Sequence, residues 1–214
     1  MKNIAILALI VACAFIQLSA TEVTTSHPMI EEAEDFALEA KPNNLTAIDL
    51  GTGTGRNIAA LLEKGATVYA YDASPESVKL LQERFSPYIK DKKLYVYQKY
   101  FEDIDSLPQA DLIIAWRSLS FMKKNRFLAF WKELENALIP NGIFTGTFFG
   151  KNHYVLVPPE ELPIVRLTQE EVLKLFINFQ ILHFQEELQY EAKASKPSDR
   201  DQFEHIYRII AKKK

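Results

Sequence analysis

The sequence predicts an α/β fold in which helices cover both faces of a mostly parallel sheet. Segments with a strand pattern alternate with segments of helical periodicity along most of the chain, and this order produces parallel sheets. Asp111–Ala115 is short and apolar after its first residue, as expected for a strand covered on both faces. The last two segments are both strands, so we expect the sheet to end in a C-terminal antiparallel hairpin.

The first twenty residues differ in character from the rest of the chain. A positive charge at Lys2 precedes the thirteen apolar residues Ile4–Ile16, and Gln17–Ala20 closes the segment with small residues. This pattern is typical of a secretory signal peptide cleaved after residue 20, and the apolar run is short for a stable membrane span. We therefore expect an exported protein, periplasmic or secreted. Two alternatives stay open: a cytoplasmic chain with a buried N-terminal helix, and a lipid anchor at Cys13, because the residues ending there resemble a lipobox.

The remaining chain divides into a short lead and one domain. Residues 21–45 are expected to form a polar lead with a surface helix at Pro28–Ala40, and residues 46–214 a single domain. Seven strands are predicted, at Thr46–Leu50, Thr67–Tyr71, Leu94–Tyr97, Asp111–Ala115, Ile143–Phe149, Phe179–Glu187 and His205–Lys212. Helices are predicted at Arg56–Lys64, Pro75–Phe85, Asn125–Leu138 and from Thr168, with a turn at Pro140–Gly142 and a loop at Glu191–Asp201.

Residues with strong positional preferences mark several helix ends. Gly65 follows the first helix of the domain, at the position where glycine often ends a helix. Ser74 is expected to cap the next helix, with Pro75 at its first position. Thr168 and Glu171 have the spacing of a capping box.

The composition excludes several classes of function. The 214-residue chain has a formal net charge of −3 and a pI near 5.9, so it has no overall positive charge to attract nucleic acid, and no nucleic-acid partner is expected. Cys13 is the only cysteine, which rules out an intramolecular disulfide and a cysteine-based metal cluster. The four histidines lack the spacing of known metal motifs, so no metal site is predicted.

A glycine-rich loop, Gly51–Gly55, lies between the first strand of the domain and the helix that follows it. Glycine allows the backbone to approach a ligand closely, and in such a sheet the loop borders the crevice beyond the carboxyl ends of the strands. Asp49 precedes the loop, and Asp72 ends the next strand, where a carboxylate can accept hydrogen bonds from both hydroxyls of a ribose. The nicotinamide and flavin fingerprint needs its third glycine at residue 56, which is Arg56 here. The loop therefore favours a nucleotide-type ligand of another kind.

Four segments match the motifs of one family: the glycine loop with its flanks, an acidic-ended second strand, a fourth strand, and a turn of the form L-x-P-x-G. They are Ala47–Asn57, Val68–Asp72, Ala110–Ala115 and Leu138–Gly142. From about Pro28 to the C-terminus the chain resembles the class I, Rossmann-like methyltransferases that use S-adenosylmethionine. Their sheet ends in an antiparallel seventh strand, which agrees with the predicted hairpin. Phe148–Gly150 and His205–Lys212 look most like small bacterial methyltransferases of the tellurite-resistance and thiopurine type.

This resemblance implies a site for S-adenosylmethionine. Asp49 and the loop backbone would hold the methionine part, and Asp72 the ribose. Phe101 and Glu102 would flank the adenine, and Trp116 would close the pocket near the sulfonium. The implied cofactor-binding residues are Asp49, Gly51, Thr52, Gly53, Thr54, Gly55, Asn57, Asp72, Ala73, Phe101, Glu102 and Trp116.

The methyl acceptor is expected to be a small molecule bound over the same edge of the sheet. Methyl transfer from a sulfonium is an in-line displacement that mainly needs alignment and exclusion of water, so no catalytic motif is expected. The acceptor-site candidates are Arg117, His153, Tyr154 and His205. Two other functions stay open: a non-catalytic protein that binds the cofactor or another nucleoside, and a nicotinamide oxidoreductase, which Arg56 and the terminal hairpin disfavour.

Overall fold

The computed structural model describes residues 26–153, 164–191 and 202–214. The expected signal segment 1–20, Tyr154 and nearly all of the loop predicted at Glu191–Asp201 lie outside the described residues. The elements are α2 (Pro28–Ala40), β1 (Thr46–Leu50), α3 (Arg56–Glu63), β2 (Thr67–Asp72), α4 (Pro75–Arg84), α5 (Ser86–Lys90), β3 (Leu94–Gln98), the 3-10 turn η1 (Phe101–Asp103), β4 (Ala110–Ala115), α6 (Lys124–Ala137), β5 (Leu138–Gly150), β6 (Arg166–Leu167), α7 (Gln169–Leu175), β7 (Phe179–Glu191) and β8 (Gln202–Lys213).

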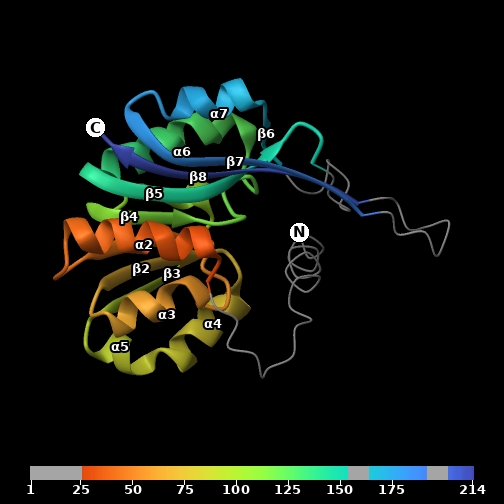
Figure 1. Cartoon of the computed structure of the whole chain (residues 1–214). Helices are drawn as coiled ribbons and strands as arrows, with labels where there is room; N and C mark the ends of the chain where they lie inside the picture. The colour runs from red at the N-terminus through yellow and green to blue at the C-terminus, as the bar shows by residue number, and fades with distance from the viewer. Residues whose placement is uncertain (1–25, 154–163, 192–201) are drawn as a thin grey trace.

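One sheet runs through the molecule in the order β3-β2-β1-β4-β5-β8-β7 (Figure 1). The first five of these strands are parallel, and β8 is antiparallel to both of its neighbours. The predicted fold, a mostly parallel sheet with a C-terminal hairpin, is confirmed. The sheet has eight strands rather than seven, because β6 pairs Arg166 and Leu167 with the end of β5. Two residues are too few to show a strand pattern in a sequence.

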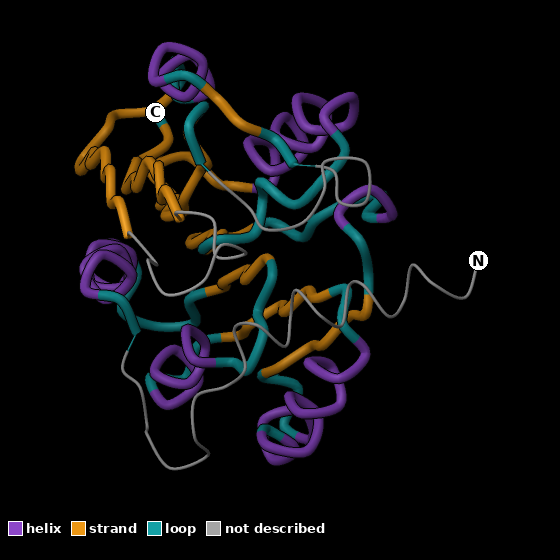
Figure 2. Tube along the Cα trace, turned by 90° about the vertical axis from the view of Figure 1, so that its right-hand side faces the viewer, coloured by secondary structure: helices purple, strands orange, loops and turns teal. Residues whose placement is uncertain are grey.

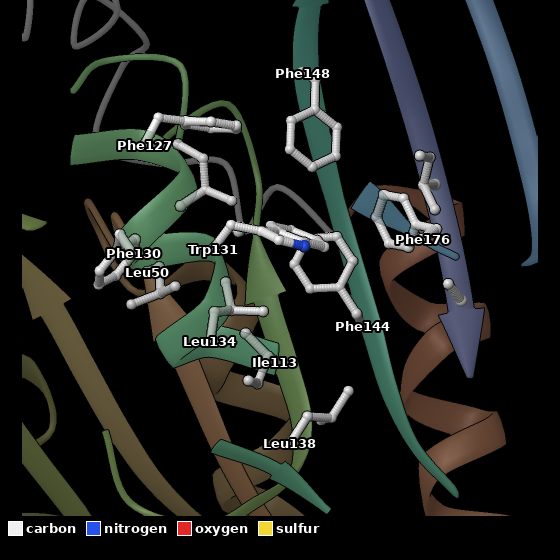
Figure 3. Close-up of a cluster of buried hydrophobic side chains, with 14 of the residues drawn as sticks. Leu50, Ile113, Phe127, Phe130, Trp131, Leu134, Leu138, Phe144, Phe148 and Phe176 are labelled. Atoms are coloured by element: carbon white, nitrogen blue, oxygen red, sulfur yellow. The ribbon is translucent and has the colours of Figure 1, made fainter. Parts of the chain in front are cut away.

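Helices cover both faces of the sheet (Figure 2). On one face α2, α3 and α4 contribute Ile30, Leu61 and Leu81 to a buried cluster with β1 and β2. On the other face α6 and α7 enclose a second buried cluster, in which Trp131 packs among aromatic side chains (Figure 3). The sheet is therefore buried between two apolar layers.

The helix ends predicted from single residues are confirmed. Ser74 accepts a hydrogen bond from Ser77 N–H, and Pro75 opens α4. Thr168 and Glu171 form the complete capping box of α7. Gly65 adopts a left-handed φ of 81° just after α3.

The prediction that a turn at Pro140–Gly142 separates α6 from the fifth strand is wrong, because these residues lie within β5. Helix α6 ends at Ala137, and the fully buried Leu138 already pairs with Ala110 as the first residue of β5. The register then shifts, so that Ile143 pairs with Leu112 and the intervening residues form a bulge inside the strand. Burial of Leu138 brings the chain into the sheet before the proline and glycine are reached.

The β7–β8 hairpin continues beyond β5 (Figure 1). Pairing between β5 and β8 ends at Phe149 and Ile206, whereas β8 remains paired with β7 as far as Gln202. Just past the last β5 pair, His205 N–H donates a hydrogen bond to His153 Nδ1 at 3.2 Å. The His153 side chain therefore accepts the hydrogen bond that a backbone carbonyl would accept if the pairing of β5 with β8 continued. Among the described residues, no helix is both long and apolar enough to cross a membrane.

Candidate cofactor and acceptor site

The glycine loop leaves β1 at the point where the strand order reverses between β1 and β4. Gly51 has a left-handed φ of +78°, and a Cβ there would overlap Ser118 in the segment after β4. At Gly53, by contrast, an added Cβ would meet nothing within 4 Å. The base of the loop is thus packed against the segment after β4, while its tip leaves space beside the backbone. This is the edge where open α/β sheets bind ligands.

Asp72, at the end of β2, joins that strand to the glycine loop. Its Oδ2 accepts a hydrogen bond from Gly53 N–H at 2.7 Å, and its Oδ1 accepts one from Ser74 N–H at 2.9 Å. Burial raises the pKa of Asp72, and these two backbone donors partly oppose the rise. Each carboxylate oxygen retains a lone pair for a further donor, such as a ribose hydroxyl.

Asp49 is a buried acid with no hydrogen-bond partner for its carboxylate. The residue is 1% exposed, and neither carboxylate oxygen is bonded. Burial, and then the charge of Asp72, raises the pKa of Asp49 to about 8; the side chains of Asn57 and Thr52 oppose this rise without completing a bond. The Thr52 hydroxyl instead donates to the Asp49 carbonyl oxygen at 3.0 Å. A buried, unpartnered carboxylate is costly, so this position suits a donor or a cation supplied by a ligand.

The remaining predicted cofactor residues lie around the same edge. Thr54 and Ala73 belong to the glycine loop and to the turn after β2. Phe101 stacks on Phe130 of α6 at 5.5 Å, and Glu102 accepts a hydrogen bond from Lys123 N–H at 2.7 Å. The Trp116 ring lies 4.6 Å from the ring of His27, the N-cap residue of α2. Glu102 thus contacts the start of α6, Phe101 packs against its middle, and Trp116 contacts the residue that caps α2.

Three of the four acceptor-site candidates gather at the ends of β4, β5 and β8. Arg117 forms an ion pair with Glu204, and its backbone N–H donates to Thr147 Oγ1 at 2.7 Å. His153 stacks on Phe149 at 3.7 Å and accepts the hydrogen bond from His205 N–H.

Burial leaves His153 neutral at physiological pH. Burial lowers the pKa of His153 to about 4; Glu204 opposes this fall, and Arg117 and Arg166 add to it. Because the charges of both Arg117 and Glu204 affect the pKa of His153, we assign this ion pair to the same cluster. Tyr154, the fourth candidate, lies outside the described residues.

Two further residues, neither of them predicted, shape the site. Ser118 packs against Gly51 and fixes the loop to the segment after β4. Glu34 of α2 is 1% exposed; one carboxylate oxygen lies 3.6 Å from Lys64 Nζ and the other has no partner. Burial raises the pKa of Glu34 to about 7. Its position on the apolar stripe with Ile30 and Ala37 was the available signal for a buried acid.

Two cavities lie away from this edge. A shallow one of about 600 Å³ covers the outer side of α7, and one of about 150 Å³ lies beside the Lys41–Asp111 ion pair at the amino end of β4. Neither includes glycine-loop residues. In the part of the chain that the structure describes, no cluster of His, Cys, Asp and Glu side chains could hold a metal ion.

Comparison with known proteins connects this geometry to one family. Residues 48–144, just under half of the chain, match the family model described as "Methyltransferase domain". The chain has the class I methyltransferase fold. Its structure resembles that of TehB from Haemophilus influenzae, with a TM-score of 0.69 at 16% identity. The match covers 88% of this chain and 63% of the TehB chain, so this chain spans less than two thirds of TehB. No curated protein sequence matches it.

Two further solved structures show the same methyltransferase fold. One is the Burkholderia thailandensis 1,6-didemethyltoxoflavin-N1-methyltransferase, with bound 1,6-didemethyltoxoflavin and S-adenosylhomocysteine; it has 18% identity, a TM-score of 0.60 and coverage of 86% and 77% of the two chains. The other is magnesium protoporphyrin IX methyltransferase from Synechocystis, with bound SAM; it has 14% identity, a TM-score of 0.59 and coverage of 87% and 79%. At these identities the likeness concerns the fold.

Proposed function

We propose that this protein is an S-adenosylmethionine-dependent methyltransferase that acts on a small molecule. The observation that carries the proposal is the buried, unpartnered carboxylate of Asp49 beneath an accessible glycine loop. The methyltransferase family match and the S-adenosylhomocysteine and SAM bound in two proteins of the same fold support it.

The residues at this edge fit the chemical groups of that cofactor. Asp49 would accept hydrogen bonds from the ammonium of the methionine part, which would relieve its missing partners. The open side of Gly53 would admit the ligand next to the backbone, and Asp72 would hold the ribose hydroxyls with its free lone pairs. When bound, the cofactor supplies a methyl group on a sulfonium, which needs no metal or general base for activation.

The acceptor would lie on the β4–β5–β8 side of the same edge. Arg117, His153 and His205 are placed there by the ends of three adjacent strands. These residues would orient the acceptor and exclude water, which is the main requirement of an in-line displacement. A screen with radiolabelled S-adenosylmethionine against thiols, phenols, amines and metalloid oxyanions tests for turnover and identifies the acceptor class. Cofactor binding without transfer to any of these classes would favour the non-catalytic alternative.

Ligand titration by calorimetry provides the direct test of the cofactor. We expect S-adenosylmethionine and S-adenosylhomocysteine to bind and NADH not to bind. Asp72→Ala should weaken binding of both by about 10- to 100-fold, because it removes charge-assisted hydrogen bonds to the ribose and frees the Gly53 and Ser74 amides. Asp72→Asn, which keeps one acceptor oxygen, should lose less. Unchanged affinity in Asp72→Ala would exclude this residue from the site, and binding of NADH alone would contradict the proposed function.

We also propose that residues 1–20 direct export of the protein. The support is the sequence pattern of one positive charge, thirteen apolar residues and a small-residue end. Cell fractionation with N-terminal sequencing should find the mature protein outside the cytosol and beginning at Thr21. A mature chain that begins with a lipidated Cys13 would instead show the lipid anchor, and a cytosolic chain that begins at Met1 would contradict export.

A further inference from the structure

The imidazole of His205 is held by contacts on several sides. A Cβ added to Gly150 would overlap the ring, so the ring lies directly against the glycine backbone. His205 Nε2 lies 2.8 Å from Glu186 Oε1, and His205 Nδ1 lies 3.3 Å from the backbone nitrogen of Asn152. The side chain is 7% exposed. Its orientation is therefore determined by the protein.

The backbone donors determine which ring nitrogen carries the proton. An amide N–H can only donate, so His205 Nδ1 must offer a lone pair to Asn152. The ring is then neutral, its proton is on Nε2, and Nε2–H donates to Glu186. The same reasoning applies to His153, whose Nδ1 accepts from His205 N–H. Its proton is therefore also on Nε2.

We propose that Glu186 is a positioning residue for the acceptor side of the site. Its carboxylate fixes His205 in the Nε2–H tautomer, and His205 then holds the turn from Gly150 to His153 through Asn152 N–H. This turn carries His153, whose Nδ1 already accepts the bond from His205 N–H, so His153 can offer an N–H donor and not a base. The inference rests on the proposed function, because His153 is one of its acceptor-site candidates. The expected acceptor is then a molecule whose reacting atom can attack the methyl group without being deprotonated by His153.

The neighbouring charges show that this role belongs to Glu186 specifically. Glu187 faces the other side of β7 and pairs with Arg208, and Glu204 pairs with Arg117. Glu186 lies opposite Tyr207 of β8, and burial and then the charge of Glu186 raise the pKa of that phenol. The Glu186 carboxylate, which is 35% exposed, thus lies beside both His205 and Tyr207. The removal of Glu187 is a matched control, because it takes away an ion-paired acid one position further along the same strand.

Long-range ¹H–¹⁵N NMR of the full chain tests the proposal, because it distinguishes the two nitrogens of each imidazole. His205→Gln assigns the signals by their loss. We expect the wild type to show a pure Nε2–H tautomer at His205, and Glu186→Ala to show a mixture of tautomers with about tenfold faster exchange of the Asn152 amide. Glu186→Gln keeps an acceptor oxygen and should preserve the Nε2–H tautomer. Glu187→Ala should leave His205 and Asn152 unchanged.

Calorimetry with S-adenosylhomocysteine on the same variants separates this inference from the proposed function. Glu186→Ala should bind it within about twofold of the wild type, since Glu186 acts on the acceptor side. Gly150→Ala displaces the ring sterically with Glu186 intact, and should also release the Asn152 amide. An unchanged His205 tautomer in Glu186→Ala, or an equal change in Glu187→Ala, would overturn the role of Glu186. A wild type that does not bind S-adenosylhomocysteine would instead overturn the proposed function.

Discussion

Replacing Asp49 with asparagine is expected to weaken cofactor binding about 100-fold while it stabilises the free protein. The loss of affinity follows from removing the charged partner of the ligand ammonium. The gain in stability follows because the carboxylate of Asp49 is buried without a partner and lies near the charge of Asp72. A neutral amide of the same size avoids most of both penalties. Opposite changes in affinity and stability are typical of residues kept for binding.

The gain in stability should depend on pH in a defined direction. The folded-state pKa of Asp49 is about 8, above its ordinary value of 3.8, so the folded protein holds a proton that the unfolded chain has already lost between these values. Wild-type stability should therefore fall as the pH rises from about 4 to 8. Urea unfolding of the free proteins should show Asp49→Asn to be about 1–3 kcal/mol more stable at pH 8, with a smaller difference at pH 5. Glu34, with its pKa raised to about 7, should leave some of this pH dependence in the variant.

Asp111 provides a matched control for this prediction. It is also a buried aspartate, but its carboxylate pairs with Lys41 at 2.8 Å and accepts a hydrogen bond from Thr46 N–H. Asp111→Asn should therefore destabilise the protein by about 1–3 kcal/mol at pH 8 and leave cofactor affinity unchanged. If Asp49→Asn also lowered stability at pH 8, or bound the cofactor as tightly as the wild type, Asp49 would not be an unsatisfied ligand-binding acid.

Replacing Trp131 with alanine is expected to destabilise the protein by about 3–5 kcal/mol. The Trp131 indole projects from α6 into an aromatic cluster (Figure 3). Its ring centre lies 5.0 Å from that of Phe176 and 5.2 Å from that of Phe144. Its Nε1–H donates to the Leu175 carbonyl oxygen at 3.1 Å, which joins α6 to α7. Truncation would leave a cavity between two helices and the sheet, and an unpaired carbonyl. Urea or thermal unfolding monitored by circular dichroism measures the loss.

Two other variants of α6 serve as controls for the loss of stability expected in Trp131→Ala. Trp131→Phe keeps much of the packed volume and removes the hydrogen bond, so it should cost less than alanine. Leu128→Ala lies on the exposed face of α6, where the side chain is 69% exposed, and should change stability by less than about 0.5 kcal/mol. A loss below about 1 kcal/mol in Trp131→Ala would mean that the aromatic cluster does not hold α6 to the sheet.

Much of the fold could be predicted from the sequence because local residue patterns determine most of its strands, helices and helix ends. Strand and helix periodicities gave the parallel sheet and its terminal hairpin, and Gly65, Ser74 and Thr168 marked helix ends through their own backbone bonds. The structure differs from the prediction where long-range contacts decide the outcome. Strand β6 exists only because Arg166 and Leu167 meet the end of β5, and the bulge near Pro140 depends on the burial of Leu138.

The candidate site likewise has parts that a local motif predicts and parts that depend on long-range contacts. The glycine loop and Asp72 form a linear motif, so their position at the strand edge followed from the sequence. The contacts of His205 did not, because no local pattern distinguishes one nearby glutamate from another as its partner. Only the pairing of β7 with β8 places Glu186 beside the ring. The missing partners of Asp49 likewise depend on how α2 and α3 close over β1, which no local pattern records.

The hydrogen bond from His205 N–H to His153 Nδ1 links the acceptor side of the site to the folding of the sheet. His153 occupies the place of a strand residue, so its position is fixed only once β8 has inserted between β5 and β7 in the correct register. A slip of one residue would turn the next residue of β8 toward His153 and point its amide away. We therefore expect assembly of the candidate site to depend on closure of the sheet. We therefore expect a chain that misfolds in this region to lack the proposed acceptor site.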